Sequence, residues 1–152
     1  MNYLEDFVAG ARYEAGPIAV EEDEVIAFAR RYDPQPFHTD HKAAENSLFG
    51  GLAASGWMTA SLTMRMLVES GNAPAGGFIA RQIEALEWPR PVRPGDTLRA
   101  VSEVVEVTPS KSRPDRGTVR MRTHTLNQAG EVVQVFTGLL VVPRKPAKGA
   151  DA

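Results

Sequence analysis

The 152-residue sequence contains no cysteine, which excludes disulfides, thiolate metal sites and cysteine nucleophiles. It also lacks an excess of positive charge. Its 17 Lys and Arg oppose 19 Asp and Glu, giving a net charge of −2, whereas a nucleic-acid-binding surface is normally basic. No apolar run is long enough to span a bilayer, and the N-terminus has no basic-then-apolar signal pattern. We therefore expect a cytoplasmic protein that binds neither membranes nor nucleic acids.

Length and composition indicate one globular domain followed by a short tail. With 152 residues, 43% of them hydrophobic and 24% charged, the chain has the size and composition of a single soluble domain. The final segment, 143–152, has the sequence PRKPAKGADA and offers little apolar area for a core. We expect a single domain over residues 1–142 and a disordered tail over residues 143–152.

Periodicity predicts helices in the first half of the chain and strands in the second. An apolar stripe at i, i+3, i+4 and i+7 from Val25 predicts a helix that stops at Asp33-Pro34. The segment 53–69 is apolar nearly all round, as is typical of a buried helix. Alternating segments predict strands at 79–88, 97–107, 118–126 and 132–142, with an edge strand at 11–14 and a turn at Gly16-Pro17. A buried helix followed by an antiparallel sheet predicts an α+β fold in which the sheet wraps the helix.

A segment with two prolines, DPQPFH from Asp33 to His38, carries the first candidate chemistry. Each proline disfavours helical geometry at the residue before it and has no N–H to donate, so we expect an extended loop or turn. A rigid loop would hold a carboxylate and an imidazole at a defined separation. Because imidazole titrates near neutral pH, such a pair is a minimal apparatus for moving protons. The other two histidines, His41 and His124, are interpreted as structural or surface residues.

The start of the long helix is the second candidate. Gly56 has two interpretations: it permits close packing of the helix on the sheet, or its N–H at the helix N-terminus holds an oxyanion. We favour the oxyanion interpretation. Ser55 either caps the helix or helps to place a substrate.

The DPQPFH segment resembles the hydratase motif of the MaoC-like dehydratases, the (R)-specific enoyl-CoA hydratase family. That motif is written Asp-x-Asn-Pro-aliphatic-His. Asp33, Pro36 and His38 match it in place, whereas Gln35 replaces the Asn and Phe37 replaces the aliphatic residue.

Two further segments are similar to the same family. FGGLAASGW at 49–57 looks like the loop and glycine that open the family's long buried helix, with Ser55 where many members carry His. PVRPGDTL at 91–98 is similar to the family's strand-turn-strand. The likeness covers roughly residues 20–142 and implies a hotdog fold, in which the antiparallel sheet wraps a long central helix.

The resemblance implies a hydro-lyase that reversibly hydrates a trans-2-enoyl-CoA to an (R)-3-hydroxyacyl-CoA. Asp33 and His38 would hold one water, remove a proton as it attacks C3 and deliver a proton to C2. The Gly56 N–H would stabilise the charge that develops on the thioester oxygen. No metal or bound cofactor is expected, since coenzyme A arrives only as part of the substrate. Substrate contacts are expected from Gln35, Phe37, Ser55 and Trp57.

Two other functions remain open on the sequence. A hotdog acyl-CoA thioesterase often places its carboxylate on the central helix, but here the only acid of that helix is Glu69, near its far end. A non-catalytic acyl-CoA-binding or partner subunit stays possible because Gln35 departs from the motif.

We expect the chain to form at least a homodimer. An apolar sheet face left exposed would form a larger apolar patch than monomers normally tolerate. The edges of an antiparallel sheet also need a partner strand or a cover, and two-fold pairing can join them. The family's usual arrangement is a hotdog dimer with acyl-CoA sites near the interface. Both alternating sets of the predicted strand 97–107 are partly apolar: Val101, Val105 and Val107 on one side, and Leu98, Ala100 and Val104 on the other.

Overall fold

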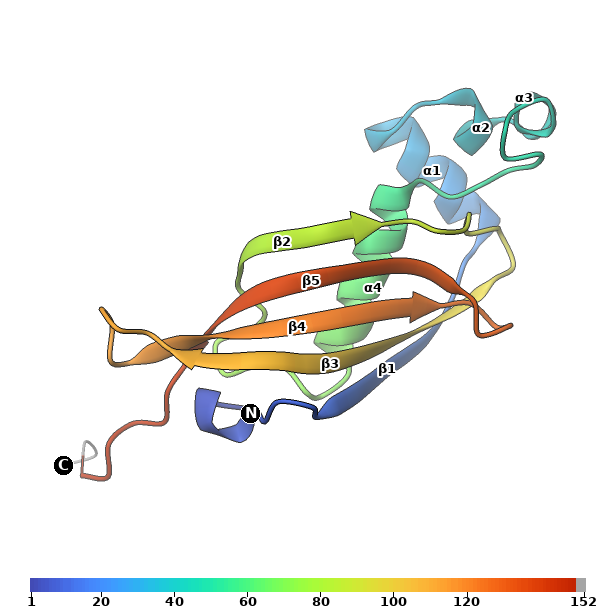
Figure 1. Cartoon of the computed structure of the whole chain (residues 1–152). Helices are drawn as coiled ribbons and strands as arrows, with labels where there is room; N and C mark the ends of the chain where they lie inside the picture. Colours follow the sequence, from blue (N-terminus) through green and yellow to red (C-terminus); the bar gives the residue numbers. More distant parts are fainter. Residues whose placement is uncertain (150–152) are drawn as a thin grey trace.

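The structure, a computed structural model, describes residues 1–149. Its five strands form one antiparallel sheet in the order β1-β3-β4-β5-β2, which curves around helix α4 (Figure 1). The expected α+β arrangement is thereby confirmed. The elements in chain order are the 3₁₀ helix η1 (Leu4–Asp6), β1 (Arg12–Ala19), α1 (Glu22–Tyr32), α2 (Pro36–Thr39), α3 (His41–Glu45), α4 (Gly56–Glu69), β2 (Ala80–Glu87), β3 (Thr97–Pro109), β4 (Arg116–Leu126) and β5 (Val132–Pro143).

Helix α1 forms where its apolar stripe and its terminal charges agree. Val25 and Ala29 are fully buried, three acidic residues lie in the first turn and two arginines lie in the last, as the helix dipole favours. Helix α4 begins after Ser55 and ends before Gly71, whose φ of +81° suits a glycine at that position. Within residues 1–149, none of these helices combines the length and the apolar character needed to cross a membrane.

The core lies between α4 and the inner face of the sheet. Met58, Leu62 and Met66 of α4 belong to the same buried cluster as Leu98 and Ala100 of β3. A second cluster, centred on residues of β3, β4 and β5, is covered by η1 and the segment after it. The short helices α1, α2 and α3 gather at one end of the molecule, near the N-terminus of α4 (Figure 1). This end carries the candidate site.

The predicted turn at Gly16-Pro17 is wrong, because these residues lie inside strand β1. Pairing between β1 and β3 shifts register between Ala15 and Ile18, and this bulge accommodates a proline that cannot donate to the ladder. The edge position expected for this strand is confirmed, since β1 is the first strand of the sheet order.

The segment around His38 is more ordered than the extended loop that the prolines predicted. Residues Pro36–Thr39 form one turn of helix, α2, with Pro36 at its first position. Proline suits that position, because an N–H there would have no helical partner. Asp40 then caps α3 by accepting from two N–H groups at its start.

The alternation expected in β3 breaks at a bulge between Val104 and Glu106. The extra residue returns Val107 to the inner face, where it packs against the second cluster. The expectation that Val107 lies on the outer face is therefore wrong. Of the other two residues expected there, Val101 is buried and Val105 is partly exposed.

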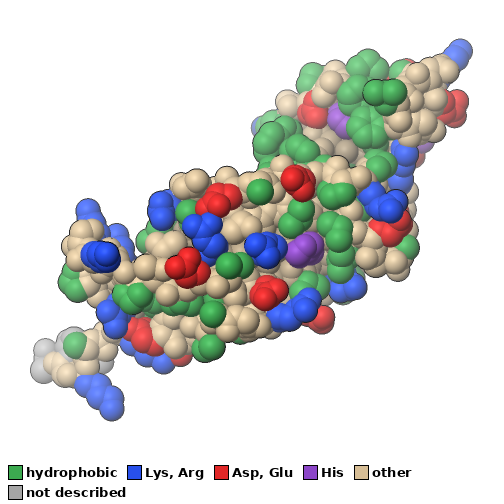
Figure 2. Space-filling view, in the orientation of Figure 1, with side chains coloured by type: hydrophobic (Ala, Val, Ile, Leu, Met, Phe, Trp, Pro, Cys, Tyr) green, Lys and Arg blue, Asp and Glu red, His purple; other side chains and the backbone are tan. Residues whose placement is uncertain are grey.

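Charged side chains of both signs are spread among apolar ones on the outer face of the sheet (Figure 2). Arg120 of β4, for example, pairs with Glu84 of β2 at 2.5 Å. A mixed, charged face of this kind is compatible with water. Exposed apolar side chains also occur along β2 and α4, among them Ile83, Trp57 and Val68.

Residues that follow Val142 contact the N-terminal segment of the chain. Pro143 belongs to β5, Arg144 pairs with Glu5 at 2.9 Å, and Lys145 pairs with Asp6 at 2.6 Å. Residues 150–152 of the predicted tail lie outside the described residues, and disorder of the tail stays a prediction.

Candidate active site

The end of α1 and the turn of α2 bring Asp33 and His38 together. Asp33 caps α1 by donating its N–H to the Ala29 carbonyl at 2.8 Å, and Pro34 prevents the helix from continuing. Two residues further on, α2 turns the chain back, so that His38 Nε2 lies 3.3 Å from Asp33 Oδ2. The juxtaposition predicted from the motif is thus present.

The two ring nitrogens of His38 have different partners. Nδ1 lies 2.6 Å from the Ala53 carbonyl, which can only accept, so Nδ1 carries the hydrogen. In the neutral ring, Nε2 then presents a lone pair on the side of Asp33. With 4% of its surface exposed, His38 is held in this orientation by burial as well as by the hydrogen bond. The ring can therefore accept a proton at a defined atom.

Two side chains donate hydrogen bonds to the Asp33 carboxylate. Ser55 Oγ donates to Oδ2 at 2.7 Å, and Gln35 Nε2 donates to Oδ1 at 2.6 Å. Burial tends to raise the pKa of Asp33, but these two hydrogen bonds and the attraction of His38 outweigh it and hold the pKa below its ordinary value. Although Gln35 is longer than the motif's Asn, it still contacts the carboxylate.

The N-terminus of α4 adjoins this pair. Ser55 caps the helix by accepting from the Trp57 N–H at 3.2 Å, while Met58 and Thr59 donate to the Ser55 carbonyl. Within the part of the chain that the structure describes, the Gly56 N–H has no acceptor. An N–H at this position can donate to an oxygen that gains negative charge. Ser55 therefore fulfils its predicted capping role.

A cleft of about 610 Å³ opens beside His38 and Gly56. Gln35 and Phe37 line it as expected, and its further lining includes Thr59 of α4 and Trp88, which follows β2. Its volume is in the range of small-molecule sites.

The other two predicted substrate-binding residues, Ser55 and Trp57, lie beside the cleft and are not among the residues that line it. Ser55 is fully buried and contacts Asp33, so it can influence a substrate only through that carboxylate. Trp57 is 58% exposed on α4, and its ring meets the Trp88 ring edge-to-face. The structure therefore places both residues next to the cleft walls.

Arg93 is a component of the site that the sequence did not single out. Its guanidinium donates to the carbonyls of Gly51 and Leu52, at 2.7 and 3.3 Å, and to that of Phe49. It thereby fixes the loop that leads from α3 to α4 and forms part of the cleft wall. The only signal was its place in the PVRPGDTL segment, where an arginine between two prolines is held in a rigid turn.

Trp88 was not predicted as a site residue either, because a tryptophan at the end of an alternating segment is most simply interpreted as part of a strand. A Cβ added to Gly56 would lie 2.5 Å from a carbon of the Trp88 ring. The packing interpretation of Gly56 is therefore correct in that no side chain fits there. It does not compete with the oxyanion interpretation, since the N–H stays free.

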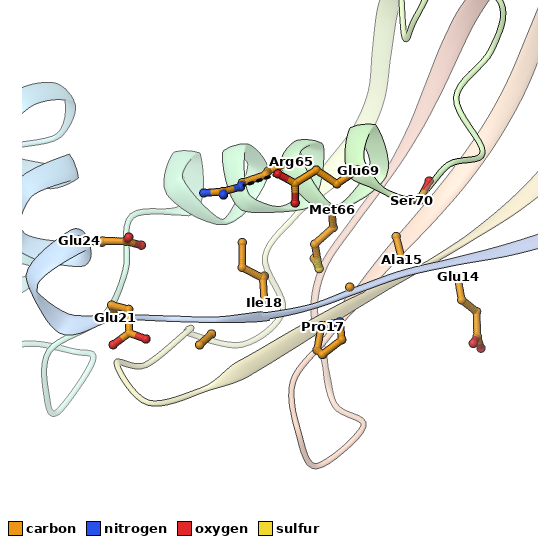
Figure 3. A pocket seen from close by; sticks show the side chains of 12 residues that line it. Glu14, Ala15, Pro17, Ile18, Glu21, Glu24, Arg65, Met66, Glu69 and Ser70 are labelled. Atoms are coloured by element: carbon orange, nitrogen blue, oxygen red, sulfur yellow. Dashed lines mark hydrogen bonds and ion pairs between the residues drawn. The ribbon is translucent and has the colours of Figure 1, made fainter. Parts of the chain in front are cut away.

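The acid of α4, Glu69, lies away from this cleft. It pairs with Arg65 at 3.0 Å on the helix surface. Both residues line a second cavity of about 630 Å³ between α4 and β1, together with Glu14, Glu21 and Glu24 (Figure 3). Glu69 is therefore not placed to act on a thioester held beside Gly56, which weakens the thioesterase alternative.

Comparison with known proteins assigns the family. Residues 6–127 match the family model described as MaoC like domain, so the chain belongs to the MaoC-like domain family. The crystal structure of a MaoC-like dehydratase from Rhodospirillum rubrum is 52% identical, covers 97% of this chain and 100% of its own, and superimposes with a TM-score of 0.93. The expected hotdog fold is thereby confirmed.

Two curated relatives are named for their reactions. A 3-hydroxybutyryl-CoA dehydratase from Methylorubrum extorquens is 29% identical, with 94% of this chain and 85% of the relative covered. An (R)-specific enoyl-CoA hydratase from Rhodospirillum rubrum is 26% identical, with 95% of this chain and 94% of the relative covered. This chain is thus similar along most of its length to proteins that add or remove water at acyl-CoA thioesters.

Proposed function

We propose that this protein is an enoyl-CoA hydratase that interconverts trans-2-enoyl-CoA and (R)-3-hydroxyacyl-CoA. The observation that carries the proposal is the pairing of Asp33 Oδ2 with His38 Nε2 at 3.3 Å, next to the free N–H of Gly56. Hydration needs a held water, a proton acceptor and a donor for the thioester oxygen. The proximity of Asp33, His38 and the Gly56 N–H supports the assignment of these three tasks to them.

The reaction would proceed with one water between the carboxylate and the imidazole. As the water oxygen attacks C3, His38 Nε2 accepts one of its protons, and the imidazolium then donates that proton to C2, so that one water supplies both the hydroxyl group on C3 and the hydrogen on C2. The electrons of the double bond move toward the thioester carbonyl, whose oxygen receives the Gly56 hydrogen bond. Asp33, kept ionised by Ser55 and Gln35, orients the water and stabilises the imidazolium that forms. Coenzyme A is the carrier part of the substrate, and the mechanism needs no metal or bound cofactor.

Crotonyl-CoA tests this proposal directly. A hydratase removes the absorbance of the conjugated enoyl thioester without releasing a thiol, and chiral analysis should identify (R)-3-hydroxybutyryl-CoA. Release of free coenzyme A would indicate a thioesterase, whereas binding without either change would indicate a non-catalytic subunit. Either of these results would overturn the hydratase proposal.

We further propose that the chain is a homodimer that pairs along β2. This strand lies at the edge of the sheet, where one row of backbone N–H and C=O groups has no neighbouring strand within residues 1–149. Exposed apolar residues flank the edge: Ile79 and Ile83 next to or in β2, and Trp57, Met64 and Val68 along one stripe of α4.

A two-fold axis at this edge would cover both the backbone groups and the apolar stripe at once. We expect an interface on the order of 2,000 Å² or more, as in obligate dimers. Sedimentation equilibrium at micromolar concentration decides the point. A mass near the 16.5 kDa of one chain would overturn the dimer proposal.

A further inference from the structure

Trp88 forms a wall of the cleft directly beside the helix N-terminus. Its ring occupies the space that a side chain on Gly56 would need, and it meets the Trp57 ring edge-to-face at 5.2 Å between centroids. If the Gly56 N–H holds the thioester oxygen, an attached acyl chain that stays in the cleft meets the Trp88 ring. The position of that ring therefore determines how much acyl chain the cleft can hold.

A chain of hydrogen bonds that runs from the partly exposed indole into the core fixes its position. Trp88 Nε1 donates to Gln134 Oε1 at 2.9 Å, and Gln134 Nε2 donates to Thr63 Oγ1 at 3.2 Å. Thr63 donates to the Thr59 carbonyl at 2.8 Å and lies 2.7 Å from the Thr125 hydroxyl. Gln134, Thr63 and Thr125 have no exposed surface. The proposed reaction uses none of these groups.

The space behind Trp88 is thus filled by polar side chains that satisfy one another. Among the described residues, no buried side-chain nitrogen or oxygen lacks a hydrogen-bond partner. A long acyl chain needs an apolar channel, and to make one here it would have to push the indole away from Gln134. That movement would leave a buried amide oxygen without its donor, which costs free energy.

We propose that Trp88, anchored by Gln134, is the end wall of the acyl pocket and limits the substrate to short-chain 2-enoyl groups of crotonyl size. The proposal rests on the hydratase function and adds a specificity-determining residue to it. Trp88 contacts the substrate, whereas Gln134 is a positioning residue that acts through the indole.

Chain-length profiles of matched variants test this. The wild type, Trp88→Ala, Trp88→Phe and Gln134→Met are assayed with crotonyl-, hexenoyl- and octenoyl-CoA. Because each misfitted methylene can cost about tenfold, kcat/KM of the wild type should fall by about 100-fold or more from crotonyl- to octenoyl-CoA. Trp88→Ala should bring that ratio to within about tenfold by removing the wall. Trp88→Phe and Gln134→Met keep most of the volume but lose the anchoring hydrogen bond, so each should relax the ratio in the same direction by a smaller factor.

Thr123→Val is the matched control, because it removes a buried hydrogen bond to Ser102 on the same face of the sheet. It should lower stability without changing the chain-length ratio. Isothermal titration calorimetry with butanoyl- and octanoyl-CoA measures the ratio of affinities for a short and a long acyl chain. This measurement needs no turnover, so it also applies to a variant that has lost activity. Absence of hydration by the wild type would count against the proposed function. Efficient hydration and binding of octenoyl- and octanoyl-CoA by the wild type, or an unchanged ratio in Trp88→Ala and Gln134→Met, would overturn the role of Trp88 alone.

Discussion

Ser55 Oγ donates to Asp33 Oδ2, the same carboxylate oxygen that lies 3.3 Å from His38 Nε2. The hydroxyl and the imidazole therefore share one oxygen, while Gln35 donates to the other oxygen. A carboxylate restrained at both oxygens has a fixed orientation and remains ionised. The cap of α4 and the proposed catalytic pair, Asp33 and His38, are thus connected through one carboxylate.

Removing either donor should raise the pKa of Asp33. Burial raises this pKa, and the hydrogen bonds from Ser55 and Gln35 and the charge of His38 lower it to a value below the ordinary one. Ser55→Ala and Gln35→Ala each remove one lowering contribution, so the carboxylate should protonate at higher pH than in the wild type. NMR titration of ¹³C-labelled aspartate measures the change. An unaltered or lowered pKa in both variants would contradict the assignment.

The lowered pKa of Asp33 in the folded protein also makes the stability of the fold depend on pH. A carboxylate with a depressed pKa in the folded state stabilises the fold above its unfolded pKa, and this contribution is lost as pH falls through the folded value. The Ser55→Ala variant should therefore lose less stability than the wild type when the pH is lowered through this window. Urea unfolding at neutral and acidic pH, with Asp33→Asn as the reference that has no titrating group, provides the comparison.

Substitution of the catalytic pair should abolish hydration while the fold survives. Asp33→Asn and His38→Gln are each expected to lower kcat by several orders of magnitude, since general acid–base catalysis contributes on the order of 10²–10⁴-fold and the pair acts together. His41→Gln is the matched control, because that histidine lies on the surface in an ion pair with Glu22. Retention of more than about a tenth of wild-type activity by either variant would refute the assignment. Circular dichroism confirms that the variants are folded.

Arg93 should contribute more to stability than other arginines. Its guanidinium donates to three carbonyls of one loop, and hydrogen bonds to charged groups contribute about 1.5–3 kcal/mol. We expect Arg93→Met to lower the free energy of unfolding by roughly 2–4 kcal/mol and to raise KM, because the loop belongs to the cleft wall. Arg65→Met, which breaks an exposed ion pair, should cost at most about 1 kcal/mol. Equal losses in the two variants, measured by urea unfolding, would show that Arg93 does not restrain the loop.

Local patterns were sufficient to predict α1, α4 and the strands of the sheet, whereas the DPQPFH motif was identified by its resemblance to the family. The stripe of α1, the apolar α4 and the alternation of the strands depend on residues close in sequence, as does the pairing of Asp33 with His38. The bulges in β1 and β3 could not be predicted, because a register shift is defined only against the neighbouring strand. The contact between Trp88 and Gln134 joins residues 46 positions apart and requires β2 and β5 to be neighbours. Strand order came from the family resemblance, since periodicity carries no information about it.

Gly56 and Trp88 should be strongly coupled. Gly56→Ala places a Cβ 2.5 Å from the indole, so the ring must move or the helix must shift. Overpacking of this kind costs about 1–3 kcal/mol, and displacement of the indole also breaks its hydrogen bond to Gln134. In a Trp88→Ala background the same methyl group has room, so Gly56→Ala should cost little or nothing there.

The resulting double-mutant cycle should give a coupling energy of about 1 kcal/mol or more, within the range for residues in contact. Urea unfolding of the wild type, the two single variants and the double variant supplies the four values. The rates of crotonyl-CoA hydration should rank the four proteins in a different order from their stabilities. Every variant keeps the backbone N–H of residue 56, and only the surroundings of that N–H change. If Gly56→Ala is equally destabilising with and without the indole, the close packing of Trp88 on the helix N-terminus is not what excludes a side chain at this position.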